Sequence, residues 1–307
     1  MNILLLCSSR FALPSMRDLV YAKQLAAVVI PSFHKEFLEE VLQLLKPLGI
    51  PVITVDKKSN EAELVKAIAK YKIDIAFMMT YSYKIPAAVF NLPPKGFFNF
   101  HPGPLPAYRG SDPIFRQIKN REKLAGVTVH KVDAGYDTGP VVTKEMIRLD
   151  ATDTYGILNN KLAELSARLC GLLLRMAGFD FAIPVKPQDE TQAVFHERQT
   201  SKDIVINWEK MEAADIVALV NACNPWNKGA VSVFNQKIIR LLDVEAVEEA
   251  VDETILPGTV ISIDPSFILV AAARGSSVRV RYIFTDEGFL KAGLLVNLGI
   301  TAGKRFG

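Results

Sequence analysis

The stretch FFNFHPGPLPAYRG at residues 97–110 begins as an apolar strand and ends as a proline-rich loop. Side chains alternate between the two faces of a strand, so Asn99 and His101 are expected on one face and Phe98 and Phe100 on the other. Proline cannot donate to a sheet ladder, so the three prolines of this stretch end the strand and stiffen the loop. Open α/β sheets place their reactive groups at the carboxyl ends of strands. The stretch therefore predicts an amide and an imidazole on a rigid shelf.

Short apolar runs alternate with amphipathic helical patterns before and after this stretch. Strands are expected at 3–7, 26–30, 51–55, 73–79, 126–132 and 141–149, and helices at 33–48, 61–71, 111–119 (with Ser111 as N-cap) and 155–176. Such a rhythm predicts a doubly wound, mostly parallel, Rossmann-like α/β sheet with right-handed crossovers. No GxGxxG or GxxxxGK[ST] pattern follows a strand, which disfavours a dehydrogenase or a P-loop enzyme.

The C-terminal part of the chain has a different pattern. Residues 179–200 have no clear period and contain two prolines, so we interpret them as a linker between a first domain, 1–178, and a second, 201–307. After a helix at 213–221, five short strands with Gly- and Asp-containing turns predict a small β-barrel: 231–234, 238–244, 258–263, 268–273 and 278–284.

The composition is that of an ordinary soluble globular protein. Of 307 residues, 50% are hydrophobic and 22% charged, and no apolar run is long enough to cross a membrane. The first residues lack a basic segment and enter a strand at once, so no signal peptide is expected. The three cysteines form no CxxC pair, which favours a reducing cytoplasm and predicts neither a metal site nor a disulfide framework.

The opening stretch resembles the signature of formyltransferases that use 10-formyltetrahydrofolate, in which Asn-x-His precedes a Leu-Pro-x-Tyr/Trp-Arg-Gly loop. Most members have Ser-Leu where this chain has Gly103-Pro104. The loop DAGYDTG at 133–139 is similar to the family's second signature, Asp-x-Gly-x-Asp-Thr-Gly. NPWNKGA at 224–230 resembles an element of the family's C-terminal domain, which is an OB-like β-barrel.

This resemblance implies a set of site residues, with 10-formyltetrahydrofolate as the co-substrate and no metal. The catalytic residues would be Asn99, His101 and Asp137; the folate-binding residues Tyr83, Ile85, Asp133 and Gly135; and the substrate-binding residues Arg10, Pro102, Gly103, Tyr108 and Arg109. On spacing alone, a single histidine after an apolar run is more often a packed residue, and an Asp-Thr-Gly loop is usually a turn.

Formyl transfer to an amine accounts for these residue types. A neutral imidazole can accept the proton that the amine loses, so His101 is expected to act as the base. A carboxylate beside it, Asp137, would hold one tautomer and stabilise the charged ring. The amide of Asn99 can donate to the oxyanion that develops on the formyl group.

The formyl acceptor is the open question. The segment after the second strand, 31–36, has no basic loop, and residues 201–307 carry 11 basic against 13 acidic residues, including an acidic run at 245–253. Nucleic-acid binding depends on cations, so we favour a small amine such as an amino-sugar nucleotide or a carrier-bound amino acid. Methionyl-tRNA is the alternative acceptor. A 10-formyltetrahydrofolate hydrolase and a non-catalytic folate-binding protein remain as further classes. The oligomeric state is open, and no membrane partner is expected.

Overall fold

The computed structural model describes residues 1–179, 182–247, 251–252 and 254–307. The chain packs into two compact units. The first comprises Met1–Pro113, Ala125–Ile147 and Asn159–Glu197, and the second Ile114–Leu124, Arg148–Leu158 and Arg198–Gly307. Each unit therefore draws on several stretches of sequence. The domain boundaries at 178 and 201 stay a prediction, and residues 180 and 181 of the expected linker lie outside the described residues.

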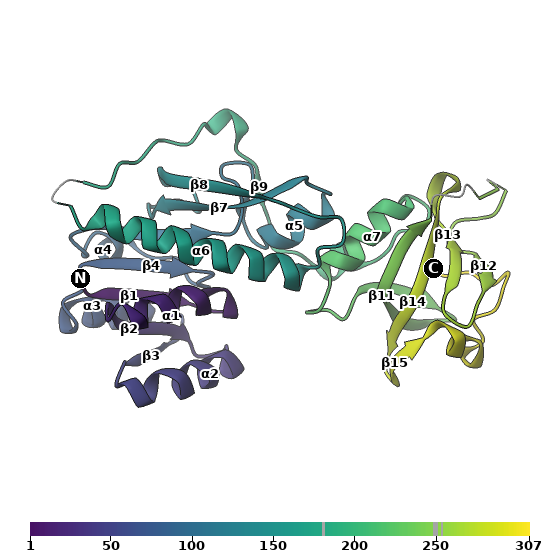
Figure 1. Cartoon of the computed structure of the whole chain (residues 1–307), viewed down its shortest axis with the longest axis horizontal. Helices are drawn as coiled ribbons and strands as arrows, with labels where there is room; N and C mark the ends of the chain where they lie inside the picture. Colours follow the sequence, from purple (N-terminus) through teal and green to yellow (C-terminus); the bar gives the residue numbers. More distant parts are fainter. Residues whose placement is uncertain (180–181, 248–250, 253) are drawn as a thin grey trace. The chain divides into compact units, whose positions relative to one another are not determined.

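The first unit is built on a sheet whose described strands run in the order β3-β2-β1-β4-β5-β7-β8 (Figure 1). Their bounds are β1 Ile3–Cys7, β2 Leu25–Pro31, β3 Val52–Val55, β4 Ile75–Met79, β5 Phe97–His101, β7 Leu124–Lys131 and β8 Val141–Arg148. The pairs from β3 to β5 are parallel, and β7 runs antiparallel to β5. The expected mostly parallel, Rossmann-like sheet is confirmed.

Helices connect the parallel strands as the sequence rhythm requires. They are α1 Leu13–Tyr21, α2 Lys35–Leu45, α3 Asn60–Lys70 and α4 Ala87–Phe90, with α5 Pro113–Lys119 and α6 Tyr155–Ala177 later in the chain. In Figure 1, α1 and α6 lie in front of the sheet, and Arg17 of α1 approaches Glu164 of α6 to 3.7 Å. Short 3₁₀ helices are η1 Arg10–Ala12, η2 Lys46–Leu48 and η3 Glu190–Gln192.

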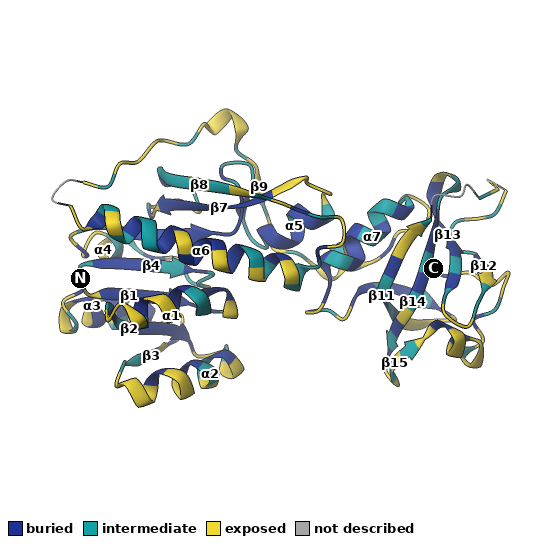
Figure 2. Ribbon diagram, viewed as in Figure 1, coloured by how far each residue is buried: buried dark blue, intermediate teal, exposed yellow. Residues whose placement is uncertain are grey.

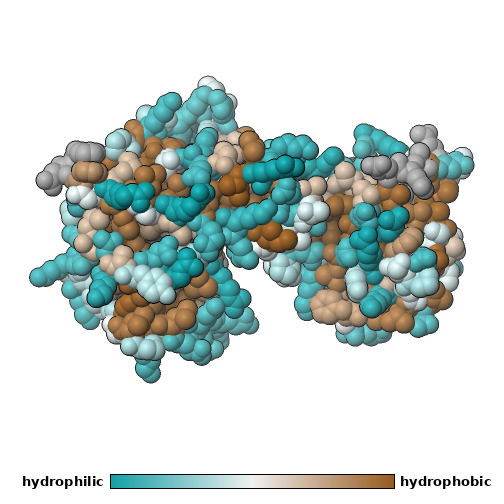
Figure 3. Space-filling model, in the orientation of Figure 1, coloured by the Kyte–Doolittle hydropathy of each residue, from teal (hydrophilic) through white to brown (hydrophobic). Residues whose placement is uncertain are grey.

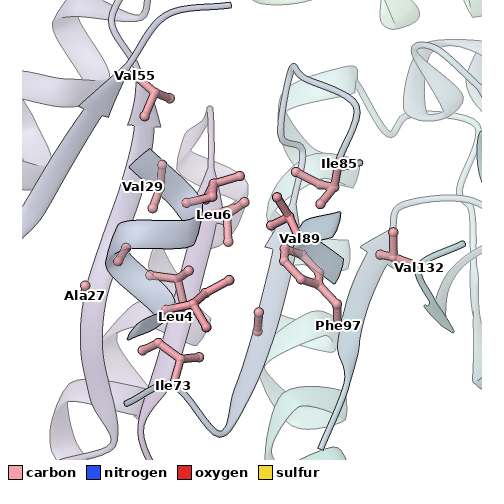
Figure 4. Close-up of a cluster of buried hydrophobic side chains, with 14 residues drawn as sticks. Leu4, Leu6, Ala27, Val29, Val55, Ile73, Ile85, Val89, Phe97 and Val132 are labelled. Atoms are coloured by element: carbon pink, nitrogen blue, oxygen red, sulfur yellow. The ribbon is translucent and has the colours of Figure 1, made fainter. Parts of the chain in front are cut away.

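These strands are continuous apolar runs in the sequence because both faces of the sheet are buried. Figure 2 shows the central strands as buried and the helices as buried on one side only, as expected for a sheet covered on both faces. Leu4 and Leu6 of β1, Val29 of β2 and Phe97 of β5 belong to one buried cluster (Figure 4). The strand that carries the site is thus anchored in the core by Phe97, two residues before Asn99 on the same face of β5.

Two details differ from the sequence expectations in the first unit. The helix expected from Ser111 begins at Pro113, because the Ser111 N–H donates to the His196 carbonyl and Asp112 has a left-handed φ of 56°. Ser111 is therefore not the N-cap. The expected linker contains a strand, β9 Phe195–His196, which pairs in parallel with β6 Arg109–Gly110.

The second unit contains an antiparallel sheet, which confirms the expected C-terminal β domain. Its described strands run β10-β11-β14-β13-β12, with β15 paired to β14. The bounds are α7 Ala213–Ala222, β10 Ala230–Phe234, β11 Lys237–Val247, β12 Val260–Ile263, β13 Ile268–Ala271, β14 Ser277–Thr285 and β15 Gly288–Lys291, with 3₁₀ helices η4 Ser201–Ile204, η5 Ala273–Gly275 and η6 Ala292–Leu298. The acidic run starts inside β11, and its residues 248–250 and 253 lie outside the described residues. Strand β15 was not expected.

Candidate functional site

The site lies at the carboxyl end of β5, where the antiparallel partner β7 adds polar side chains of its own. In this pairing Asn99 is opposite His130, and His101 is opposite Thr128. Residues that face each other across two strands project to the same face of a sheet. All four side chains are buried. One face of two neighbouring strands therefore presents an amide, two imidazoles and a hydroxyl.

The Asp137 carboxylate, on the loop after β7, completes this group. Its Oδ1 lies 3.2 Å from Asn99 Nδ2, 3.6 Å from His101 Nδ1 and 3.5 Å from His130 Nε2. Its Oδ2 accepts a hydrogen bond of 3.0 Å from the Gly110 N–H. The structure thus brings the three residues expected to be catalytic into one cluster, although their chemical roles stay predictions.

The charges in this cluster are set by competing effects. Burial acts to raise the pKa of Asp137, but the neighbouring imidazoles of His101 and His130 and the Gly110 N–H outweigh it, and the net pKa is well below the usual range. Burial lowers the pKa of His101 from its ordinary value of 6.5, and this outweighs the nearby Asp137 charge. At neutral pH the cluster therefore holds an ionised carboxylate beside a neutral imidazole.

The tautomer of His101 follows from its second contact. His101 Nε2 lies 2.6 Å from the Tyr108 carbonyl oxygen, which can only accept a hydrogen bond. In the neutral ring Nε2 must therefore carry the hydrogen, and Nδ1 carries the lone pair. Since Nδ1 faces Asp137, a proton taken up there is stabilised by the carboxylate.

The Asn99 amide is held in one orientation by charge. Its Nδ2 lies 3.2 Å from Asp137 Oδ1 and 3.1 Å from His130 Nε2. His130 Nδ1 lies 3.1 Å from the Lys131 carbonyl oxygen, which only accepts, so the tautomer with its hydrogen on Nδ1 leaves Nε2 as an acceptor for Asn99. A flipped amide would place its oxygen against the ionised carboxylate. Donating to an oxyanion, the role expected from the sequence, requires Asn99 to give up one of these bonds. The bond to Asp137 is the stronger of the two, because an ionised carboxylate is a charge-assisted acceptor, so the bond to His130 is the one to be given up.

His130 was missed in the sequence interpretation. The run Val127-Thr128-Val129-His130 has the same alternation of polar and apolar residues as residues 98–101. This alternation could have placed Thr128 and His130 on one strand face. Only the register between β5 and β7 brings His130 opposite Asn99, and a single sequence does not contain that register.

Thr128 of β7 holds the loop that follows His101 through two hydrogen bonds. Thr128 Oγ1 accepts from the Leu105 N–H at 3.0 Å and donates to the Gly103 carbonyl at 2.8 Å. A Cβ on Gly103 would lie 3.1 Å from His101 Nε2 and 2.9 Å from the Pro113 Cβ. The expected substrate-binding residues Pro102, Gly103 and Tyr108 are all buried beside or under the His101 ring, and their contact with a substrate stays a prediction.

Gly110 is the point at which this loop and β9 meet, and replacing it tests that contact. At a φ of 93°, a Cβ here would lie 2.2 Å from the His196 carbonyl oxygen. Gly110→Ala must separate β6 from β9, so we expect the free energy of unfolding to fall by about 1–3 kcal/mol, the usual cost of overpacking. Chemical denaturation measures this loss.

Gly49→Ala is the matched control for Gly110→Ala. Gly49 also has a positive φ, 67°, but no atom lies within 4 Å of an added Cβ. Gly49→Ala therefore has the conformational cost of a left-handed residue without the steric clash. Equal losses for the two variants would show that the contact of Gly110 with β9 is unimportant.

The residues expected to bind folate lie on two loops, one after β4 and one after β7. Tyr83 packs edge-on against Phe33 and Tyr81, whereas Ile85 is buried in the core cluster (Figure 4). Asp133 Oδ1 accepts from the Gly135 N–H at 3.0 Å and from Thr138 Oγ1 at 2.7 Å, which ties together the two ends of the loop that carries Asp137. Lys84 Nζ lies 4.8 Å from the Tyr136 ring centroid, so the two loops touch. Folate binding by these residues stays a prediction.

The two arginines expected at the substrate differ in their surroundings. Arg10 is exposed, and its Nε bonds Glu40 at 2.8 Å. Arg109 is 6% exposed, and its guanidinium is engaged by Glu190 and Gln188 at 2.7–3.1 Å. Substrate contact stays a prediction for both, and for Arg109 the observed partners are protein groups.

Neither a metal-binding cluster nor a membrane-spanning helix is found in the described residues. Over residues 1–179, 182–247, 251–252 and 254–307, no group of three or more His, Cys, Asp or Glu side chains is arranged to hold a metal ion. No helix within those ranges is long and apolar enough to cross a membrane. Figure 3 shows one face of the molecule, on which polar and apolar residues are interspersed.

Comparison with known proteins agrees with the geometry. Residues 20–172 match the family model described as formyl transferase, and residues 199–288 match the formyl transferase C-terminal domain. A methionyl-tRNA formyltransferase of Dictyoglomus thermophilum is 35% identical over 216 residues, which is 70% of this chain and 68% of that one. The chain belongs to the formyl transferase family. A second methionyl-tRNA formyltransferase, from Pelotomaculum thermopropionicum, is 31% identical over 282 residues, or 90% of this formyltransferase and 88% of that one.

Solved structures share the fold of this formyltransferase. The sugar 3N-formyl transferase WlaRD, in the presence of dTDP and 5-N-formyl-THF, superimposes with a TM-score of 0.69 at 16% identity, over 91% of this chain and 97% of that one. HypX from Aquifex aeolicus in complex with tetrahydrofolic acid gives 0.64 at 22% identity, over 96% of this chain and 46% of that one. At these identities the likeness concerns the fold alone.

Proposed function

We propose that this formyltransferase transfers the formyl group of 10-formyltetrahydrofolate to a small primary amine. The observation that carries the proposal is the buried cluster of Asn99, His101 and Asp137, in which a neutral imidazole lies beside an ionised carboxylate. The folate donor is supported by the two solved structures above that share the fold, one in complex with tetrahydrofolic acid and one in the presence of 5-N-formyl-THF.

The proposed reaction uses His101 twice. The neutral amine attacks the formyl carbon, a C–N bond forms, and the carbonyl electron pair moves to oxygen. His101 Nδ1 takes the proton that the amine loses, and the Asp137 carboxylate 3.6 Å away stabilises the imidazolium. The oxyanion then collapses and the bond from carbon to N10 breaks. His101 returns the proton to N10. The products are tetrahydrofolate and the N-formyl amine.

Asn99 is the proposed donor to the tetrahedral oxyanion. In the resting cluster one of its N–H groups points to Asp137 and the other to His130. An oxyanion is a charged acceptor and competes well with the His130 ring nitrogen for the second N–H. In this proposal His130 holds the Asn99 amide in place until the oxyanion forms.

The preference for a small acceptor rests on charge. Strand β2 ends at Pro31 and α2 begins at Lys35, so the connection is only three residues long and contains no arginine or lysine. In the second unit, Arg279 and Arg281 pair with Glu245, so their charge is partly neutralised by their own sheet. A phosphate backbone needs unpaired cations.

Methionyl-tRNA is the second candidate acceptor, and two observations favour it. The curated relatives above are methionyl-tRNA formyltransferases that align along most of their length. The segment around α5 also brings four basic residues into the second unit: Arg116, Lys119, Arg121 and Lys123. Three of the four pair with Asp203 or Asp215.

Release of tetrahydrofolate from 10-formyltetrahydrofolate distinguishes the acceptors. The purified protein is given methionyl-tRNA, a panel of amino-sugar nucleotides and carrier-bound amino acids, or no acceptor. Release only with a small amine supports the proposal. Release only with methionyl-tRNA, falling steeply with salt, establishes the second candidate instead. Release without acceptor identifies a hydrolase, and no release under any condition overturns formyl transfer from folate.

The pH profile of this reaction tests the proposed base. Burial lowers the pKa of His101 from 6.5, and the base must be neutral to act. The kcat/KM of the transferase is therefore expected to rise with pH through a pKa below 6.5 and to be level at neutral pH. The profile is measured with an acceptor whose amine does not titrate in that range. An acid limb centred above 7 contradicts the assignment.

A further inference from the structure

A segment that the sequence pattern left as linker lies against the proposed catalytic loop. The N–H groups of Val141 and Lys186 each donate to the other residue's carbonyl at 2.7 Å. This pair fixes residues 186–192 beside the end of the loop that carries Asp137. The segment is therefore attached to the first unit by backbone bonds close to the site.

Gln188 makes the next contact of this segment with the loop. Its Nε2 donates to the Asp137 carbonyl and to the Gly139 carbonyl, both at 2.8 Å. The two N–H groups of one amide thus span Thr138 and hold both ends of a three-residue turn. Donor bonds to these two carbonyls fix the path of the backbone from Asp137 to Gly139, directly after the carboxylate.

Arg109 holds the other end of the Gln188 amide. Its Nε and one terminal nitrogen donate to Gln188 Oε1 at 3.1 and 2.9 Å. The remaining bonds of its guanidinium run to Glu190, at 2.7 and 2.8 Å. The next residue, Gly110, donates its own N–H to Asp137 Oδ2. One strand, β6, therefore reaches Asp137 twice: directly at the carboxylate, and through Gln188 at the carbonyl.

The backbone of Asp137 needs such support. Asp137 has a φ of 55°, in the left-handed region that residues with a Cβ seldom adopt. A residue in this conformation persists when its surroundings hold it there. The direction of its side chain, and hence the position of Oδ1 between Asn99 and His101, depends on that backbone conformation.

We propose that Gln188, clamped by Arg109, is a positioning residue that holds Asp137 against His101 for the transfer reaction. This inference rests on the proposed function and deepens it. Gln188 does not touch the reacting atoms and acts only through the Asp137 backbone. Gln188 then belongs to the catalytic unit, although the sequence pattern left it in a connection.

Gln188→Met tests the proposal, because methionine keeps the length of the side chain and removes both donors without adding charge. Gln192→Met is the matched control: Gln192 is in the same segment, but its Nε2 bonds the exposed Asp189. The pKa of His101 is measured by NMR titration of the folate-free protein, which needs no turnover. An Asp137 carboxylate that drifts away no longer favours the imidazolium, so the pKa of His101 falls further in Gln188→Met and is unchanged in Gln192→Met.

Kinetics give the second readout. We expect kcat to fall about tenfold to hundredfold in Gln188→Met, the effect of misplacing a catalytic group by about 1 Å, with KM for the folate unchanged. A wild-type pKa of His101 and a wild-type kcat in Gln188→Met overturn the proposal. An inactive wild-type protein would count against the proposed function instead. The NMR titration needs no activity, so it would still test the role of Gln188.

A second variant guards against misfolding. Gln188→Glu keeps an acceptor for Arg109 and changes only the two donors, so the clamp from β6 survives. If Gln188→Met does not fold, Gln188→Glu is expected to fold and to lose kcat by a similar factor. Full activity of Gln188→Glu would contradict the proposal, because the carboxylate cannot donate to the Asp137 and Gly139 carbonyls.

Discussion

Replacing His101 by alanine is expected to lower kcat for formyl transfer by roughly 10²- to 10⁴-fold, the usual contribution of a general base. The reason is that His101 Nδ1 is the proposed proton acceptor and faces the Asp137 carboxylate at 3.6 Å. Tetrahydrofolate release under saturating folate and acceptor measures the loss. Folate binding is expected to change little, since the role of His101 lies in the proton transfer.

His101→Gln separates proton transfer from packing. A glutamine fills much of the same space and can donate to the Tyr108 carbonyl, as His101 Nε2 does, but it cannot act as a base at neutral pH. We expect His101→Gln to be as slow as His101→Ala. Near-normal rates in His101→Gln would show that the ring has only a structural role.

Asp137→Asn is expected to lower kcat by about 10²- to 10⁴-fold, in line with the loss of a carboxylate that stabilises the charged form of a catalytic imidazole. The amide keeps the shape but removes the charge that favours imidazolium, and its NH₂ must face one of the two donors, Asn99 at the Oδ1 position or Gly110 at the Oδ2 position. The acid limb of the pH profile is expected to move to lower pH, because Asp137 raises the pKa of His101. A full pH–rate profile measures both effects.

Asp189→Asn is the charge-matched control for this change. Asp189 belongs to the same unit, but its carboxylate is exposed and accepts from Thr191 and Gln192. Its replacement is expected to leave both kcat and the pH profile as in the wild type. A normal rate in Asp137→Asn, or equal losses in the two variants, would contradict the role proposed for Asp137.

The fold was largely predictable because each element has its own local signal. Strand β1 is a run of five buried apolar residues and was expected at the same residues, Ile3–Cys7. Gly49, with a φ of 67°, ends η2 at the point where the sequence predicts the end of the helix at 33–48. Strand β15, Gly288–Lys291, has too short a pattern to stand out, and it pairs with residues 282–285 of β14, beyond the residues that β13 pairs.

The site was predictable in part. Alternation along β5 placed Asn99 and His101 on one face, and the family signature supplied Asp137. His130 was not found, because it approaches Asn99 only through the antiparallel register of β7. Gln188 could not be found either: its bonds cross 51 and 49 residues of sequence to Asp137 and Gly139, and no periodic pattern records such contacts.

Measuring tetrahydrofolate and the N-formyl product together, in one reaction with 10-formyltetrahydrofolate and an amine acceptor, tests the central claim most directly. If the cluster around His101 transfers the formyl group to the amine, the two products form in equal amounts and only when the amine is present. Tetrahydrofolate with free formate in place of the N-formyl amine, or no tetrahydrofolate at all, would contradict formyl transfer at this site.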